Sequence, residues 1–360
     1  MKSSYLLIGI KTKKLFRLLS ENKISFRPKY FVRLLFIIQN AFWSSLFSKR
    51  ENGIVNNKLK TVQLPDNPVF IVGHWRTGTT YLQKLMSFDE NFITPTLFQT
   101  FIPEGFVNSY KFYKPIMKRM LGKNRPFDNM KAGMDEPQED EFALFRLSGY
   151  SPLLNLIFPK NNKYFLSEMV DFIPQKENLS NWVNSIDFFY KKLSFVYKKR
   201  LLIKNPFHSL RIDFLKNKFP NAKFIHIYRN PMDVVVSTVK MWSIVGSNNE
   251  MNGKWEIPSY AEVSGFYDFM LTKVNKDLSG MADGSYCEIA FEEIEANPVL
   301  AIVKIYNQLG LDYSEDYLKK INEFVESNSD YQKNTYNISK EEVDIVNSKM
   351  EQHKIRYGYI

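Results

Sequence analysis

The residues best suited to chemistry stand in a short glycine loop near residue 75. Residues 68–72 (PVFIV) are continuously apolar and rich in β-branched side chains, as a buried parallel strand is, and GHWRTGTT follows at 73–80. Gly73 and Gly78 have the spacing of a phosphate-binding loop, in which backbone N–H groups and the positive end of the next helix attract an anion. The sequence therefore predicts an anion site here, with a purely structural tight turn as the alternative.

The cation of this loop is not where a nucleoside triphosphatase has it. Thr79 stands at the position of the lysine that reaches the β- and γ-phosphates, and the positive charge lies at Arg76 instead. A planar guanidinium suits two oxygens of a phosphate or sulfate group. The pattern disfavours triphosphate hydrolysis and favours another phosphorylated ligand.

A second strand-to-helix turn offers another candidate anion site. Residues 223–228 (KFIHIY) have a strand pattern that ends at Arg229, and NPMD at 230–233 is typical of a helix start, with Asn as the N-cap and Pro at the first helical position. Ser237 follows within the helix. We expect Arg229 and Ser237 to bind an anion together; the alternatives are an ion pair between Arg229 and Asp233 and an ordinary helix serine.

Strand and helix patterns alternate over most of the chain. Short strand patterns at 200–204 (RLLIK) and 286–291 (YCEIAF) join those at 68–72 and 223–228. Such alternation predicts an α/β fold in which a parallel β-sheet is flanked by helices on both faces. We expect this domain to span residues 61–360.

Residues 1–60 differ from the rest in their pattern of apolar and basic residues and are predicted to form an N-terminal helical extension. The apolar stretch 30–47 is interrupted by polar residues and is shorter than the ~20 residues that a spanning helix needs, so no transmembrane helix is predicted. Peripheral contact with a membrane surface and a helical hairpin packed on the main domain remain open as alternatives. The basic residues that would favour the membrane are Lys11, Lys13, Lys14 and Arg17.

Composition limits the classes of protein to be considered. The chain has 360 residues, 44% of them hydrophobic, which excludes disorder or a coiled coil as its main character. Its net charge of +11 favours an anionic partner such as a phosphorylated cofactor, a membrane surface or nucleic acid, and charge alone does not choose among them. Of these partners we expect no nucleic acid. Cys287 is the only cysteine, which fits a reducing cytoplasm, and the histidines lack metal-ligand spacing, so no metal is expected.

At these motifs the chain resembles the sulfotransferases that use 3'-phosphoadenosine 5'-phosphosulfate (PAPS), in particular their bacterial branch. FIVGHWRTGTT at 70–80 is similar to the 5'-phosphosulfate loop of that family, and FIHIYRNPMDVVVS at 224–237 is similar to its 3'-phosphate motif. EIAFEEIEANP at 288–298 resembles the family's strand and acidic turn, although Phe291 stands where the family often has Tyr. The resemblance runs from about residue 68 to the C-terminus and implies a P-loop-like α/β fold with PAPS as co-substrate.

The resemblance also assigns roles to single residues. It implies that the first loop holds the 5'-phosphosulfate, that an aromatic residue lies near the adenine, and that Arg229 and Ser237 hold the 3'-phosphate. The implied cofactor-binding residues are Arg76, Thr77, Gly78, Thr79, Thr80, Tyr81, Arg229 and Ser237.

Sulfuryl transfer needs cations for the developing negative charge and a base for the acceptor proton. The resemblance identifies Lys204, at the end of the 200–204 strand, as the lysine that stabilises the transition state; a surface lysine is the alternative. Many cytosolic members have a catalytic histidine two residues after this lysine, where Pro206 stands here. His208 is therefore only a secondary candidate for the base.

The acidic segment 135–141 (DEPQEDE) resembles the part of the bacterial branch that supplies a carboxylate base. Glu139 is the first candidate and Asp140 the second. The alternative is an ordinary helix start, with Pro137 at the first position of a helix over 142–147 and acids that complement its dipole.

The sequence thus predicts an enzyme that transfers a sulfuryl group from PAPS to a hydroxyl or amine. Aromatic and Met-rich residues over 98–120 would suit a lipid or sterol alcohol if they line a pocket, or would be ordinary core; a glycan is the other acceptor class. A P-loop small-molecule kinase and a non-catalytic, membrane-associated anion-binding module are the alternatives. We expect the protein in the cytoplasm, with peripheral contact at the inner membrane face.

Overall fold

Two compact units make up the chain in the computed structural model, and both are assembled from separate segments. The structure describes residues 6–24, 28–120, 133–160, 172–173, 175–328 and 338–359. Unit 1 comprises Met1–Leu64, Pro95–Lys198 and Trp242–Ile257; unit 2 comprises Pro65–Thr94, Lys199–Met241 and Pro258–Ile360. The predicted boundary at residue 60 stays a prediction, but residues 1–64 belong to a unit that also contains later segments.

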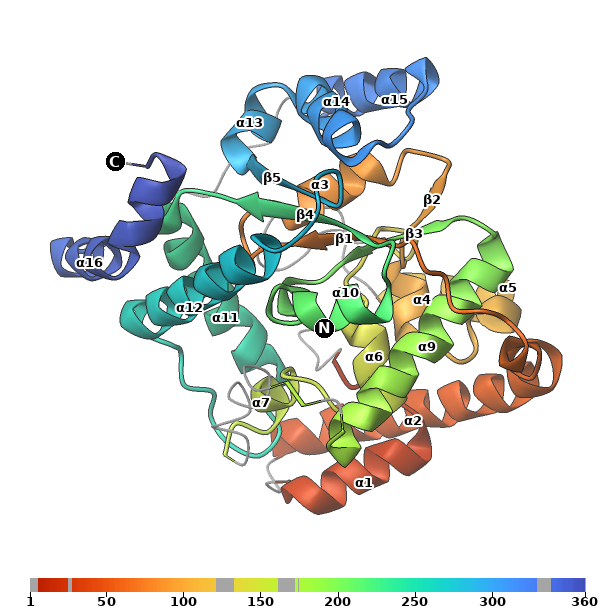
Figure 1. Cartoon of the computed structure of the whole chain (residues 1–360). Coiled ribbons are helices and arrows are strands. Elements are labelled where there is room, and N and C mark those ends of the chain that lie inside the picture. Colours follow the sequence, from red (N-terminus) through yellow and green to blue (C-terminus); the bar gives the residue numbers. More distant parts are fainter. Residues whose placement is uncertain are drawn as a thin grey trace. The chain divides into compact units, whose positions relative to one another are not determined.

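A five-stranded parallel sheet forms the centre of unit 2 (Figure 1). The strand order is β2-β3-β1-β4-β5, and every pairing is parallel. The register sets Ile71 beside Lys204 on one side and Ile225 on the other, so the ends of β1, β3 and β4 lie together. The strands are β1 (Val69–Val72), β2 (Phe92–Ile93), β3 (Arg200–Lys204), β4 (Lys223–Tyr228) and β5 (Tyr286–Ala290).

Helices cover both faces of this sheet, which confirms the predicted α/β class. One apolar core joins the sheet to α3 (Thr79–Met86), α13 (Phe291–Ala296), α14 (Pro298–Leu309) and α15 (Glu315–Glu326). On the other face Phe70 packs on His208 and Phe219, at the short helix η3 (Pro206–Leu210) and the end of α10 (Ile212–Lys218). Figure 1 shows α13 to α15 on one side of the sheet and α10 on the other.

Three further helices pack together through Val235, Tyr267, Val346 and other buried side chains. They are α11 (Pro231–Asn249), which begins in unit 2 and ends in unit 1, α12 (Tyr260–Leu278) and α16 (Lys340–Tyr357). As the sequence predicted, Asn230 caps α11, because its Oδ1 accepts the N–H of Met232 at 3.0 Å. Strand β5 ends one residue earlier than expected, since Phe291 begins α13 and the side chain of Glu293 accepts the Ala290 N–H.

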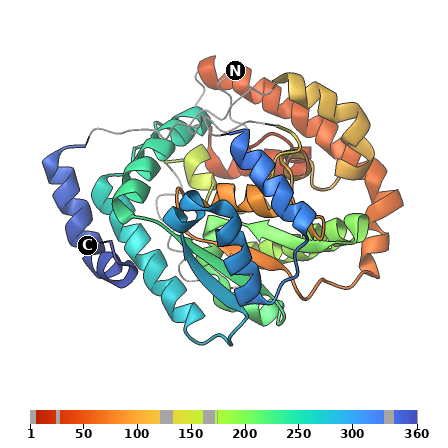
Figure 2. The same cartoon turned by 90° about the horizontal axis from the view of Figure 1, so that it is seen from above.

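The regular elements of unit 1 are all helices within its described residues. It contains α1 (Thr12–Asn22), α2 (Pro28–Glu51), η1 (Asn52–Asn56), η2 (Lys58–Lys60), α4 (Leu97–Phe101), α5 (Phe106–Met120), α6 (Glu141–Ser148), α7 (Leu154–Ile157) and α9 (Glu177–Tyr197). Figure 2 gives the view from above. The helical character predicted for residues 1–60 is therefore present, with α1 and α2 as its longest helices.

The second of these helices is longer than the apolar stretch considered in the sequence. Tyr30–Asn56 is long and apolar enough to cross a membrane, with a mean hydropathy of 1.3. This statement rests on the length and composition of the helix alone. The basic flank of α1 is partly engaged within unit 1, because Lys11 forms an ion pair with Glu104 at 2.7 Å. Lys14 donates to the Leu147 carbonyl, and burial lowers its pKa to about 8.

Candidate functional site

The glycine loop between β1 and α3 has the backbone of a phosphate cradle. Gly73 and Gly78 have φ values of +145° and +96°, and a Cβ at either position would overlap the Ile227 carbonyl or the Phe291 ring. Only glycine fits such close approach at positive φ. The loop is closed by Thr77, whose Oγ1 donates to the His74 carbonyl at 2.7 Å. The backbone geometry thus explains both glycines of the predicted motif.

Both halves of the predicted cofactor site meet at one point of unit 2. Arg76, inside the loop at φ +70°, donates from Nε to Oγ of Ser237 on α11 at 2.8 Å. Arg229, at the end of β4, donates to the backbone carbonyl of Arg76 at 3.4 Å. The structure therefore brings Arg76, Arg229 and Ser237 together, although 161 residues separate the first from the last.

The ion pair considered as an alternative for Arg229 is also present. Its Nη2 lies 2.9 Å from Oδ2 of Asp233, and the guanidinium lies 4.7 Å from the centre of the Phe291 ring. Among the described residues Nε of Arg229 has no hydrogen-bond partner. Asp233 is exposed to 53%, so water screens this pair and leaves the guanidinium available to a second anion.

The lysine at the end of β3 faces the start of α3. Lys204 is 1% exposed, and its Nζ donates to Oγ1 of Thr80 at 3.3 Å. The parallel pairing of β3 with β1 fixes this position. A buried ammonium at the N-terminus of a helix is a strong local source of positive potential. The surface-lysine alternative is therefore wrong for this residue.

Aromatic side chains border the loop. Tyr81 lies on the first turns of α3, with its ring centre 6.5 Å from that of Phe291. Burial raises the pKa of its hydroxyl, so Tyr81 stays neutral at ordinary pH. On the other side, Trp75 packs edge-on against Phe207 at 4.7 Å and stacks with Phe266 at 6.1 Å. These contacts hold the loop between two aromatic clusters.

His74 is a buried, neutral member of the loop. Its Nδ1–H donates to the Trp75 carbonyl at 2.9 Å, and its ring packs on that of Tyr267 at 4.6 Å. Burial lowers the pKa of the imidazole to about 4. The loop therefore carries no histidine charge at neutral pH.

The secondary candidate base, His208, lies in η3 with a fully buried side chain. Its ring meets that of Phe70 at 5.7 Å, and its Nδ1 lies 3.4 Å from Nη1 of Arg211. Through His208 the segment after Lys204 packs against the sheet. The role of His208 as a base stays a prediction.

The acidic segment belongs to unit 1, and its local structure differs from the expected one. Helix α6 begins at Glu141 with Asp140 as its N-cap residue, and Pro137 pairs with Thr96 in an isolated β-bridge instead of occupying the first helical position. The Pro137 prediction was wrong because the backbone stays extended through this bridge. Glu139 thus precedes the helix and is not one of its first-turn acids.

The two candidate carboxylates of this segment differ in burial. Asp140 is fully buried, and its Oδ2 accepts the hydroxyl of Tyr190 on α9 at 2.7 Å. Glu139 is only half-buried. The bond from Tyr190 to the buried Asp140 carboxylate holds α6 on α9. The role of either carboxylate as a base stays a prediction.

Two contacts of the loop were not predicted from the sequence. Oγ of Ser209 accepts the N–H of Gly73 at 2.8 Å, and Phe291 fills the space beside Gly78. Ser209 lies 136 residues from its partner and belongs to no motif. No local signal would have identified it.

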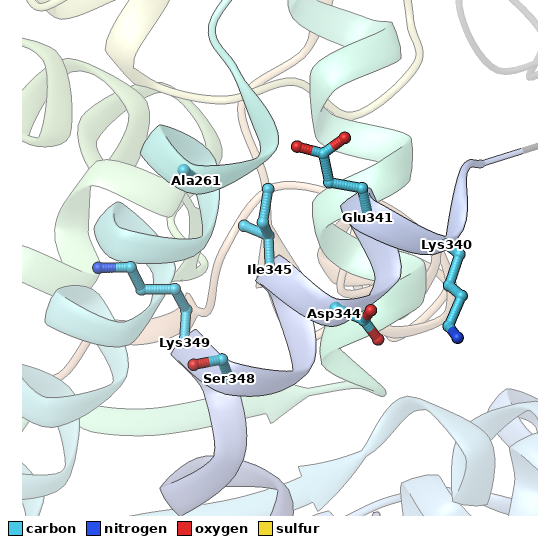
Figure 3. Close-up of a pocket in the computed structure, with 7 residues that line it drawn as sticks. All are labelled: Ala261, Lys340, Glu341, Asp344, Ile345, Ser348 and Lys349. Atoms are coloured by element: carbon cyan, nitrogen blue, oxygen red, sulfur yellow. The ribbon is translucent and has the colours of Figure 1, made fainter.

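An open depression elsewhere in unit 2 contains none of the predicted site residues. It is lined by Ala261 of α12 and by one side of α16, with Lys340, Glu341, Asp344, Ile345, Ser348 and Lys349. Figure 3 shows the charged ends of Lys340, Glu341 and Lys349 directed apart. They do not converge on one ligand position. Among the described residues no group of three metal-ligating side chains occurs.

The known proteins that this chain resembles in sequence are sulfotransferases. The family model described as the sulfotransferase family matches residues 68–315. The omega-hydroxy-beta-dihydromenaquinone-9 sulfotransferases of Mycobacterium bovis and Mycobacterium tuberculosis are each 29% identical over 308 residues, which cover 85% of this chain and 79% of theirs. The region 68–315 that the family model matches contains both strand-to-helix turns described above.

Solved structures with the same fold include two mycobacterial sulfotransferases. One from Mycobacterium avium has a TM-score of 0.69 at 12% identity and covers 97% of each chain. One from Mycobacterium tuberculosis has a TM-score of 0.62 at 14% identity, covering 94% of this chain and 90% of its own. At such identities the likeness concerns the fold alone.

Proposed function

Since the chain belongs to the sulfotransferase family, we propose that it transfers the sulfuryl group of PAPS to the hydroxyl of a lipid-like alcohol. The observation that carries the proposal is the meeting of Arg76, Ser237 and Arg229 between the ends of β1 and β4. A ligand with phosphate groups at both ends of a nucleoside needs cations and hydroxyls from two turns, and unit 2 supplies both. A kinase is disfavoured, because Thr79 stands where a triphosphate loop has its lysine.

The proposed division of labour follows from the two turns. The loop N–H groups and Arg76 bind the 5'-phosphosulfate, since N–H groups at a helix start favour an anion. Arg229 and Ser237 bind the 3'-phosphate, for which Arg229 keeps an Nε without a protein partner among the described residues. Tyr81 and Phe291 offer aromatic surfaces for the adenine.

The reaction breaks the bond between sulfur and the bridging oxygen of the 5'-phosphosulfate and forms a bond between sulfur and the acceptor oxygen. Negative charge grows on the bridging oxygen, and adenosine 3',5'-bisphosphate leaves with it. Lys204 is the proposed cation for that charge, supported by its burial and its position beside Thr80. The acceptor hydroxyl gives up its proton to a base, and Glu139 is the proposed one because it is only half-buried, whereas Asp140 is fully buried.

The acceptor class is proposed from the relatives. Their name gives the substrate as an omega-hydroxy-beta-dihydromenaquinone-9, which is a lipid-like alcohol. Similarity at 29% identity supports a lipid-like alcohol for this chain without fixing which one.

The test is incubation of the protein with ³⁵S-labelled PAPS and matched acceptors: a polyprenyl alcohol, a sterol, an oligosaccharide and a long-chain amine. We expect label in the polyprenyl alcohol and at least tenfold less in the oligosaccharide and the amine. A protein that labels only the oligosaccharide or the amine would refute the acceptor class and leave sulfotransfer intact. Absence of label in all acceptors, with PAPS bound, would refute transfer to this range of acceptors.

A further inference from the structure

The outward face of α2 is apolar along almost its whole length. Its exposed positions recur at intervals of three and four residues and form one stripe along the helix, which the exposed Gln39 interrupts. We name these six residues, between 39% and 71% exposed, the α2 apolar face: Phe31, Val32, Leu35, Phe42, Trp43 and Leu46. Together they expose on the order of 600 Å², at the upper end of the ~300–600 Å² of the largest apolar patch on a typical monomer.

The inward face of the same helix carries polar side chains among the buried apolar Tyr30, Ile37, Ala41 and Phe47. Asn40, Ser44, Ser48 and Glu51 are each at most 4% exposed. Oδ1 of Asn40 accepts the hydroxyl of Tyr113 at 2.7 Å, and Glu51 forms a fully buried ion pair with Lys192 of α9. A surface helix of a water-soluble protein turns its apolar stripe inward and presents polar side chains to water. Helix α2 therefore presents to its surroundings the side that such a helix hides.

Helix α5 extends this surface. It packs beside α2 through Phe47 and Tyr113, whose ring centres are 5.1 Å apart, and Figure 2 shows the two helices side by side. Phe112 and Ile116, one turn apart on α5, are 72% and 45% exposed.

Exposed cations end both helices. Lys49 and Arg50 follow the α2 apolar face, and Lys118 and Arg119 lie in the last turn of α5. Neither helix contains an acidic residue apart from the buried Glu51. An apolar stripe flanked by cations complements an anionic lipid surface, where the apolar groups enter the acyl boundary and the cations meet the headgroups.

We propose that the α2 apolar face, with Phe112 and Ile116, docks on an anionic lipid bilayer and lies in its interface. A spanning helix would carry Asn40, Ser44 and Ser48 and the ion pair of Glu51 through hydrocarbon, where unsatisfied polar groups are costly. A second copy of the chain docked through the same two helices would bring no exposed carboxylate to meet these cations, since Glu51 is buried. The lipid surface is the partner that satisfies both the apolar stripe and the charge.

The test is flotation of the full-length protein with vesicles of phosphatidylcholine and phosphatidylglycerol, without PAPS or acceptor. We expect binding that weakens when phosphatidylglycerol is left out or salt is raised. The double variant Phe42→Ser/Trp43→Gln should bind about tenfold to a hundredfold less, since two apolar side chains are lost from the buried surface. Lys49→Gln/Arg50→Gln should lose most of the preference for the anionic lipid.

The matched control is Leu300→Ser on α14, another exposed apolar residue, which is 64% exposed and lies in unit 2. Its vesicle binding should equal that of the unaltered protein, and thermal melting should be unchanged in all variants. Equal binding by the Phe42→Ser/Trp43→Gln variant would overturn the proposal. So would resistance to carbonate extraction, which indicates a spanning helix, or a dimer that this variant dissociates while vesicles bind neither form. Because no substrate is present, the outcome is independent of the proposed sulfotransfer.

Discussion

The guanidinium of Arg76 donates from Nε to Oγ of Ser237 at 2.8 Å, which ties the loop after β1 to the helix after β4. The sequence indicates two separate anion sites at these turns, and the structure makes them neighbours. A change at either residue therefore affects the other site.

This link predicts that Arg76→Ala weakens cofactor binding and turnover together. Loss of a charge-assisted hydrogen bond to an anion costs about 1.5–3 kcal/mol, or roughly tenfold to a hundredfold in affinity. Titration calorimetry with adenosine 3',5'-bisphosphate and steady-state kinetics measure both effects. Ser237→Ala should cost less alone, and the double variant should cost less than the sum of the two, since the residues are in contact. Unchanged affinity and turnover in Arg76→Ala would contradict the assignment.

Arg229 should set the preference for a 3'-phosphate. We expect the unaltered protein to bind adenosine 3',5'-bisphosphate far more tightly than adenosine 5'-monophosphate, and Arg229→Ala to lose most of that difference. Asp233→Asn is the matched control: it removes the ion-pair partner at 2.9 Å but keeps the guanidinium. Competition binding with the two nucleotides measures this preference. A preference that survives in Arg229→Ala would contradict the role of Arg229 in binding the 3'-phosphate.

Glu139→Gln should lower kcat by roughly 10²–10⁴-fold with little change in cofactor affinity, because a general base acts mainly in the transition state. Asp140→Asn should instead lower the melting temperature, since it weakens the buried bond from Tyr190. Kinetics and melting curves of both variants separate the roles. If Glu139→Gln stays active while His208→Ala loses all activity at unchanged stability, the base is the histidine.

Acid should destabilise the glycine loop through His74. Burial lowers its pKa to about 4 in the folded protein, whereas the unfolded chain has a histidine pKa near 6.5. Between these values the unfolded state binds more protons, so stability falls as pH drops from about 6.5 toward 4, by at most about 3 kcal/mol. His74→Asn keeps a donor for the Trp75 carbonyl and removes the titration. Urea unfolding at pH 7 and pH 5 should show a smaller loss for this variant, and an equal loss would show that other groups cause it.

Much of the site in unit 2 was predictable because it depends on local chemistry. Gly73 and Gly78 stand where the backbone requires positive φ. Asn230 is the N-cap of α11, and Pro231 is its first helical residue. The strands around them are short apolar runs of the kind that a parallel sheet buries. These features need only a few neighbouring residues to be recognised.

The features that were missed depend on distant partners. Pro137 is compatible with a helix start, and only its bridge to Thr96 keeps it extended. The two-residue strand β2 is too short to show a period. The burial of the polar residues of α2 is visible only once Glu51 is seen beside Lys192, because the composition of a helix does not show which side it buries.

The most direct test of the central claim is a mass balance of the transfer itself. The purified protein is incubated with PAPS and a polyprenyl alcohol, and both products are followed by mass spectrometry, with Lys204→Met as the matched variant. We predict an acceptor heavier by one SO₃ group, formed in equal amount with adenosine 3',5'-bisphosphate, and a loss of at least a hundredfold in rate for Lys204→Met at unchanged stability. Release of adenosine 3',5'-bisphosphate without a sulfated acceptor, or an equal rate in the variant, would contradict it.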